Sequence, residues 1–289
     1  MTSWSPTGCW RTGHKRWEVC PVKKNIWKLL LAAVFAVCLA VVLWKQADYR
    51  RGNANYNEAV TLAKGDTSEP AGPPENTPPP EKEEVPPPDD PYAAILVGLD
   101  LAALQEVNSD VLGWIEIPDT NLSYPLLQGS DNSYYLNHTW TKVRNSMGAI
   151  FLDQEVSGDL SDFNTIVYGH RMRNISMFGP LSSYKKLSFW REHPSVYIVD
   201  TKGVYRYDIY AAYEPRVKTI TYGLDITDDQ VKEEFIRFGL EKSVIQTDIV
   251  PTTQDKILTM STCTGSGHAT RWVVQAVLRY TYFKPDAAS

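Results

Sequence analysis

The alternation of apolar and polar residues is clearest near the C-terminus, where the chain predicts a strand, a turn and a second strand. Residues 256–263 and 271–278 are rich in apolar and β-branched side chains, and residues 264–270 between them include two glycines and are typical of a turn. Paired strands of this length form a hairpin. We therefore expect Cys263 and Arg271 to lie close together at its mouth.

The period of two assigns each side chain of the hairpin to a face. The residues expected to share one, largely apolar face are Leu258, Met260, Thr262, Trp272, Val274, Ala276 and Leu278. Thr259, Ser261 and Cys263 then point to the other, more polar face, together with Arg271. We expect the thiol and the guanidinium to face away from the core.

Six further apolar runs, each followed by turn-forming residues, predict additional strands. They cover residues 112–117, 122–127, 149–152, 165–168, 196–199 and 204–213. Many short strands separated by turns indicate a mainly β domain built as a barrel or a sandwich.

Two segments show helical spacing instead. Residues 93–107 predict an opening helix, and its expected docking residues are Leu96, Leu99, Leu101 and Leu104. Residues 228–238 predict a helix just before the hairpin, because Val231, Phe235 and Phe238 recur at helical spacing and Thr227 can cap its start.

An apolar run near the N-terminus, residues 26–44, is long enough for a single bilayer span, and Lys28 is its only charge. Five basic residues precede this run and three follow it, so we expect residues 1–25 to stay in the cytoplasm. A cleaved signal peptide is the alternative, but the run is long for one and no clear cleavage motif follows it. The prediction is a single-pass membrane protein whose bulk lies outside the cell.

The next segment, residues 45–91, is polar at first and then dominated by proline and acidic residues. Residues 65–91 cannot bury a core, which predicts an extended stalk. Residues 92–285 are then expected to form one domain. A fragment starting near Tyr92 should fold without the preceding segments.

Cysteine usage singles out one residue. Cys9 and Cys20 fall in the predicted cytoplasmic tail and Cys38 in the span, so Cys263 is the only cysteine of the exported part. Exported cysteines are usually paired. A lone one is either a buried packing residue or a nucleophile.

A cysteine nucleophile needs an acid–base partner and a group that stabilises the oxyanion. His170 ends the predicted strand 165–168 after Gly169, a position suited to a cleft, although alone it is as compatible with a structural role. His268 is nearer to Cys263 in sequence but lies in the predicted turn, where we expect it to be solvated. Arg271 can direct a permanently charged guanidinium at an oxyanion.

Other candidate sites find little support in the sequence. His138 and His193 are interpreted as surface or packing residues, and the spacing of Cys9, His14 and Cys20 matches no standard zinc pattern. The chain has no glycine-rich phosphate loop, no HExxH pair and no cluster of base-stacking aromatics. We therefore expect no cofactor, no metal and no nucleic-acid partner.

The residues around Cys263 resemble the signature of a known family. Thr259-Met260-Ser261-Thr262-Cys263 is similar to the Thr-Leu-x-Thr-Cys motif of sortases, with methionine in place of leucine at similar volume. Further segments resemble class B sortases in the same order, namely residues 110–115, 124–128, 131–136, 168–172 and 177–179. Together they span nearly the whole predicted domain, and both predicted helices fit that class.

The resemblance implies an eight-stranded sortase barrel with His170, Cys263 and Arg271 as catalytic residues. Cys263 would attack the threonine carbonyl of a C-terminal sorting motif in secreted proteins of a Gram-positive cell. The acyl group would then pass to an amine of a lipid II-type cell-wall precursor, or to a pilin lysine. Ser261 and Thr262 would contact the substrate backbone.

Three alternatives stay open at this point. An L,D-transpeptidase also uses cysteine, histidine and arginine, but its Ser-x-Gly-Cys-Arg motif is absent here. A papain-like cysteine endopeptidase would place its histidine after its cysteine, opposite to the order of His170 and Cys263. In a surface adhesin Cys263 would be inert.

Overall fold

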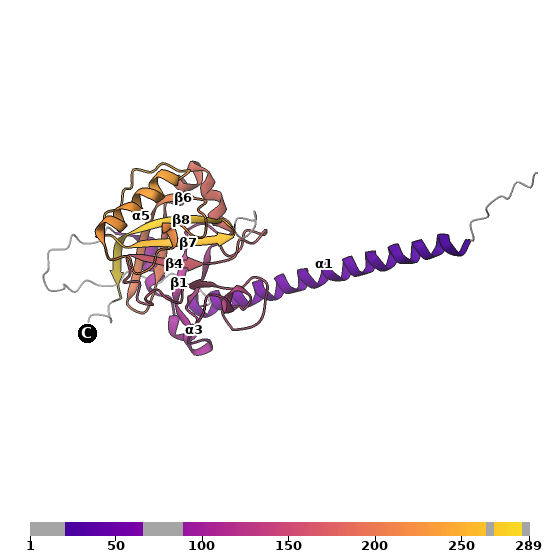
Figure 1. Ribbon diagram of the computed structural model, residues 1–289. Helices are drawn as coiled ribbons and strands as arrows, with labels where there is room; N and C mark the ends of the chain where they lie inside the picture. The colour runs from indigo at the N-terminus through magenta and orange to yellow at the C-terminus, as the bar shows by residue number, and fades with distance from the viewer. Residues whose placement is uncertain (1–20, 66–88, 264–268, 285–289) are drawn as a thin grey trace, which may run out of the picture. The chain divides into compact units, whose positions relative to one another are not determined.

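The computed structural model describes residues 21–65, 89–263 and 269–284 (Figure 1). The side chains of residues 21–25 and of Cys263 are not part of this description. Most of the predicted tail and stalk, and also His268, lie outside the described residues. The chain divides into two compact units, Met1–Ala47 and Asp48–Ser289.

The described part of the first unit belongs to helix α1 (Pro21–Lys64), which continues into the second unit. From Ile26 onward this helix is long and apolar enough to cross a membrane, with a mean hydropathy of 2.7 in its most apolar window. None of that window is buried by other parts of the protein. The apolar run 26–44 is thus a candidate span, as the sequence predicted.

Eight strands of the second unit close into a barrel in the order β1-β2-β3-β4-β7-β8-β6-β5. Their bounds are β1 (Val111–Glu116), β2 (Ser123–Leu127), β3 (Ile150–Leu152), β4 (Asn164–Tyr168), β5 (Ser195–Val199), β6 (Gly203–Tyr213), β7 (Ile257–Cys263) and β8 (Arg271–Phe283). Every predicted strand is present within a few residues. The pairs β2–β3 and β4–β7 are parallel and the other neighbours are antiparallel, so the predicted eight-stranded barrel is confirmed.

The core lies inside the barrel, and the hairpin β7–β8 contributes to it as its alternation predicted. Its side chains in the main buried cluster are Leu258, Met260, Trp272, Val274 and Ala276, with Leu278 packed against them. A second cluster lies on the other face of the same strands, where Phe235 and Ile236 of α5 (Asp229–Lys242) pack against Val273. Figure 1 shows α5 beside β6 and β8.

The more polar face of the hairpin is also covered at the residues before Cys263. Thr259 is completely buried and Ser261 is 2% exposed. The pattern could not show this, because the cover comes from α5 and the segment before it. Polar side chains lie under this cover because each finds a hydrogen-bond partner there.

The predicted opening helix is in fact two short helices, α2 (Pro91–Val97) and α3 (Leu101–Val107). Asp90 caps the first and Asp100 the second, since each carboxylate accepts backbone N–H groups of the first turn. The four leucines predicted to dock are all buried. The break falls at Gly98 to Asp100, where a new cap competes with helix continuation.

Helix α5 is present before the hairpin, but its cap is Asp228 rather than Thr227. The Asp228 carboxylate accepts hydrogen bonds from the backbone N–H groups of Gln230 and Val231. Four short elements carried no clear pattern and were not predicted, namely η1 (Tyr134–Leu136), η2 (Gly179–Lys185), α4 (Leu187–Glu192) and η3 (Ile220–Tyr222).

The second half of α1 packs against the barrel domain, a contact that the sequence reasoning missed. Gly52, Tyr56, Ala59 and Ala63 are buried. Their spacing of four, three and four residues places them on one helix face. The Trp140 indole N–H donates to the carbonyl of Asn55 at 2.9 Å, which fixes the middle of the helix.

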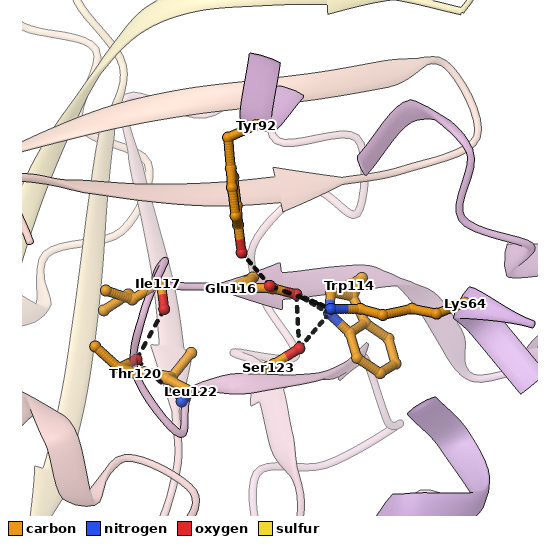
Figure 2. A network of polar contacts seen from close by, with 8 residues as sticks. All are labelled: Lys64, Tyr92, Trp114, Glu116, Ile117, Thr120, Leu122 and Ser123. Carbon is orange, nitrogen blue, oxygen red and sulfur yellow. Dashed lines mark hydrogen bonds and ion pairs between the residues drawn. The ribbon is translucent and has the colours of Figure 1, made fainter. Parts of the chain in front are cut away.

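The end of α1 is held by the carboxylate of Glu116 on β1, shown in Figure 2. The ammonium of Lys64 lies 3.0 Å from its Oε2. Trp114 donates its indole N–H and Ser123 its hydroxyl to the same oxygen, at 3.0 and 2.6 Å. The hydroxyl of Tyr92 on α2 donates to the other oxygen, so one buried carboxylate joins α1, α2, β1 and β2.

Burial by itself would raise the pKa of Glu116. The hydrogen bonds from Ser123 and Tyr92 and the charge of Lys64 outweigh burial and lower the pKa below its usual 4.5. A lowered folded-state pKa means that this carboxylate stabilises the fold above pH about 4.5, and that this stability is lost as the pH falls through the folded-state value.

The docked helix changes the expectation for a fragment that begins near Tyr92. We predict that a fragment from Asp48 unfolds at higher denaturant concentration than one from Pro91. The difference in the free energy of unfolding should be at least about 3 kcal/mol, the cost of losing one well-packed aromatic side chain such as Tyr56. Urea unfolding measures both fragments. Within the longer fragment, Tyr56→Ala should lower the free energy of unfolding more than the control Arg51→Ala, which changes an exposed residue of the same helix. Equal midpoints of the two fragments, or equal losses of free energy in the two variants, would contradict the packing.

A second prediction concerns acid. Glu116→Gln should lower the free energy of unfolding at pH 7 by roughly 1 to 3 kcal/mol, because it leaves buried donors poorly satisfied. The gap between wild type and variant should shrink as the pH falls below about 4.5, since the wild-type carboxylate is then protonated as well. Denaturation of both proteins between pH 3 and 8 measures this. The exposed Glu155→Gln is the control, and a gap independent of pH would refute the role of Glu116.

Candidate active site

Three neighbouring strands bring the candidate catalytic residues to one end of the barrel. In the parallel pair β4–β7, Tyr168 lies opposite Ser261, and the Gly169 N–H donates to the Ser261 carbonyl at 3.3 Å. His170 therefore follows β4 beside the end of β7. In the antiparallel pair β7–β8, Cys263 lies directly opposite Arg271.

The backbones of His170, Cys263 and Arg271 thus meet although 93 residues separate the first two in sequence. The thiol itself lies outside the description, as does all of His268. The expected hairpin is present, with Cys263 as the last residue of β7 and Arg271 as the first of β8.

The imidazole of His170 is held by a backbone carbonyl. Its Nε2 lies 2.6 Å from the carbonyl oxygen of Leu136 in η1. A carbonyl only accepts, so Nε2 carries a proton and Nδ1 is the acceptor of the neutral ring. The tautomer follows from this contact.

Gly148 sits behind the imidazole and allows this close approach. Its φ of +60° is in the left-handed region, and a Cβ there would lie 2.6 Å from the Tyr135 carbonyl oxygen and 3.0 Å from Cδ2 of His170. The Tyr56 hydroxyl on α1 donates to the Gly148 carbonyl at 2.5 Å. Helix α1 therefore supports the loop that holds His170.

Arg271 is partly buried, and both its backbone and its guanidinium make hydrogen bonds. Its N–H donates to the Pro215 carbonyl at 3.1 Å, and its Nη1 donates to the Thr270 carbonyl at 3.0 Å. Burial and the nearby Asp153 carboxylate raise the pKa of Tyr168, and the positive charge of Arg271 opposes this rise. The positive charge of Arg271 is therefore close enough to Tyr168, the last residue of β4, to lower the pKa of its hydroxyl.

Ser261 and Thr262, the predicted substrate contacts, are both 2% exposed. The Ser261 hydroxyl lies 2.9 Å from the hydroxyl of Tyr222 in η3. The Thr262 hydroxyl is buried without a partner among the described residues. Their role in substrate binding stays a prediction. No sequence motif marks Tyr222, because only the fold of the segment before α5 brings it to Ser261.

The first residue of the sequence signature has a structural role. The Thr259 hydroxyl donates to Asn164 on β4 at 2.7 Å and accepts from the Gln275 amide on β8 at 3.1 Å. Tyr210 on β6 donates to Gln275 at 2.9 Å. This buried network links four adjacent strands and fixes the registers that align His170, Cys263 and Arg271.

The other described histidines pack against neighbours. His138 stacks on the Tyr134 ring with 4.0 Å between centroids, and Nδ1 of His193 lies 2.9 Å from the Pro118 carbonyl. Among the described residues, no group of three or more His, Cys, Asp or Glu side chains is placed to hold a metal ion.

Comparison with known proteins gives a consistent result. The sortase domain family matches residues 115–279, more than half of the chain. Sortase B of Staphylococcus aureus is 35% identical over 161 residues, which cover 56% of this chain and 66% of that protein. Sortase B of Listeria monocytogenes is 33% identical over 164 residues, or 57% and 67%. The matches thus span about two thirds of these relatives.

Solved structures agree. The crystal structure of Staphylococcus aureus sortase B superposes with a TM-score of 0.60 at 34% identity and covers 63% of this chain and 87% of that one. Sortase B from Bacillus anthracis gives 0.63 at 29% identity and covers 80% and 98%. Barrel, motif order and relatives agree, and the chain therefore belongs to the sortase family, within class B.

Proposed function

We propose that this protein is a membrane-anchored cysteine transpeptidase. The observation that carries the proposal is the register of β4, β7 and β8, which brings His170 and Arg271 to the end of the strand that finishes at Cys263. Membership of the sortase family supports it. It also disfavours the L,D-transpeptidase, papain-like and adhesin alternatives, none of which has this family's domain.

In the proposed reaction the Cys263 thiolate attacks the threonine carbonyl of a sorting motif. Arg271 stabilises the oxyanion of the tetrahedral intermediate. As the C–N bond breaks, imidazolium His170 gives its proton to the departing amine, which leaves a thioester on Cys263. A guanidinium and an imidazolium nearby both favour the thiolate.

Transfer completes the cycle. An incoming amine attacks the thioester, neutral His170 takes its proton, and the collapse of the second tetrahedral intermediate releases Cys263 and forms a new amide bond. The bond from His170 Nε2 to Leu136 leaves Nδ1 as the nitrogen proposed to exchange this proton. Water in place of the amine would give peptidase activity.

The substrates are proposed from the relatives. One solved structure is a Staphylococcus aureus sortase B–substrate complex, and another is a sortase B complexed with triglycine. Because triglycine is a peptide with a free amine, it supports a peptide amine as acceptor here. We propose the amine of a lipid II-type cell-wall precursor, with a pilin lysine as the second candidate.

The candidate span of α1 supports a location in the cell membrane. The excess of basic residues before the span supports an orientation with the N-terminus in the cytoplasm and the catalytic domain outside.

The test of the proposed function is mass spectrometry of the protein incubated with a small library of sorting peptides. We expect one or more peptides to leave an acyl adduct on Cys263 that disappears when an amine is added, with formation of a new amide product. An adduct that only hydrolyses in the presence of every amine offered would make the protein a peptidase. Labelling of no peptide at all would refute the function.

A further prediction compares three variants. Cys263→Ala should abolish cleavage and transfer without changing the melting temperature. His170→Ala should reduce single-turnover transfer by about 10² to 10⁴-fold, the usual worth of general acid–base catalysis, whereas His268→Ala should be mild. If His268→Ala is the more damaging of the two, or if Cys263→Ala retains transfer, the assigned residues are wrong.

Two variants of Arg271 distinguish the effect of its charge from the effect of its planar hydrogen-bonding geometry. Arg271→Lys keeps the charge but loses the planar donor fork and should still cost most of the rate, and Arg271→Ala should cost on the order of 10² to 10³-fold. Because the oxyanion exists only in the transition states and intermediates, kcat should fall more than KM rises. Steady-state kinetics of both variants measure this. A large rise in KM with kcat preserved would instead indicate substrate positioning.

A further inference from the structure

A groove of about 410 Å³ lies between the second half of α1, the turn after β1 and the loop after β4. Four of its nine lining residues are asparagines, namely Asn53, Asn57, Asn121 and Asn174. They come from three segments far apart in sequence, so the groove exists only because α1 is docked. Its volume falls in the usual range of small-molecule sites, about 300 to 1,000 Å³.

The lining contains no Asp, Glu, Lys, Arg or His side chain. Beside the asparagines there are two tyrosines, two serines and a valine, although 22% of the chain is charged. A charged ligand would lose hydration there without meeting a counter-charge. The groove therefore suits a ligand that is polar but neutral.

The asparagines offer free hydrogen-bonding capacity. Asn53, Asn57 and Asn121 are exposed, and their side-chain amides bond to none of the described residues. Each amide presents donors and an acceptor side by side. Hydroxyl groups also donate and accept at one atom, so neighbouring hydroxyls of a sugar match such amides.

The floor of the groove is aromatic and fixed. The rings of Tyr56 and Tyr124 pack edge to face with 5.2 Å between centroids. The Tyr56 hydroxyl donates to the Gly148 carbonyl, and the Tyr124 hydroxyl accepts from the Met177 N–H at 3.0 Å. Tyr56 is 4% and Tyr124 8% exposed, so the rings present only a small area to a ligand, and apolar C–H groups of a sugar ring match that area.

We propose that this groove binds a neutral oligosaccharide. The proposal goes beyond the transfer reaction and does not depend on it, because binding alone tests it. Asn174 lies on the segment that follows His170, so a bound saccharide would contact a loop next to the candidate active site.

The test is saturation-transfer difference NMR on the full chain in zwitterionic lipid nanodiscs. The probes are fully N-acetylated chitotetraose (chitotetraose below), which is neutral, a hyaluronan tetrasaccharide, which also contains N-acetylglucosamine but is anionic, and the neutral peptide acetyl-tetraalanine amide. Empty nanodiscs give the background. We expect saturation of chitotetraose above background, and weaker or no saturation of the other two.

The variants Asn57→Ala and Asn121→Ala should each weaken chitotetraose binding about fivefold, the loss expected for one hydrogen bond. Both residues are exposed, so the fold should survive, and circular dichroism checks this. Gln254→Ala removes an exposed amide from the turn after α5 and should leave binding unchanged.

Several results would overturn the proposal. They are chitotetraose signals no higher than those of empty nanodiscs, equal binding of the anionic tetrasaccharide, binding of the peptide alone, or equal affinity in the asparagine variants and wild type. None of these measurements involves Cys263, so their outcome does not decide whether the proposed transfer reaction is correct.

Discussion

The parallel pairing of β4 with β7 is the constraint on which the candidate site depends. A parallel neighbour aligns strand ends of the same polarity, so the residues that follow β4 and those that end β7 come to one edge of the barrel. The buried Thr259 hydroxyl, bonded to both Asn164 and Gln275, holds this register across β4, β7 and β8. A slip of one residue would move the segment after β4 relative to the end of β7 and turn the side chains of β4 to the other face.

The second half of α1 contributes to the same site from behind. Tyr56 reaches the loop carrying Gly148, which lies against the imidazole of His170, and Lys64 ends the helix on the Glu116 carboxylate. These are buried contacts with small residues at the interface, so the helix can approach the barrel closely. The segment that follows the candidate span is thus part of the folded domain, and the same docking creates the asparagine-lined groove.

Opposite charges lie near the strand ends, with the Asp153 carboxylate and the Arg271 guanidinium both acting on Tyr168. The Tyr168 hydroxyl donates to Asp153 at 2.9 Å, and the field of Arg271 reaches this pair. The charge of a partly buried guanidinium is screened less than one in water, so it acts more strongly on its neighbours. This gives physical content to the proposed stabilisation of an oxyanion beside Cys263.

The sequence by itself determined the local elements, because strand and helix periods depend on neighbouring residues. All eight strands, the four docking leucines and the hairpin that sets Cys263 opposite Arg271 were predicted from such patterns. The spacing of Gly52, Tyr56, Ala59 and Ala63 is also present in the sequence, but these small and aromatic residues are separated by polar ones and give no strong apolar stripe. Only the tertiary structure decided which strands are neighbours, what covers the polar face of β7, and which groups meet Tyr222, Gly148 and Glu116. Those contacts join residues far apart in the chain, and no local period encodes them.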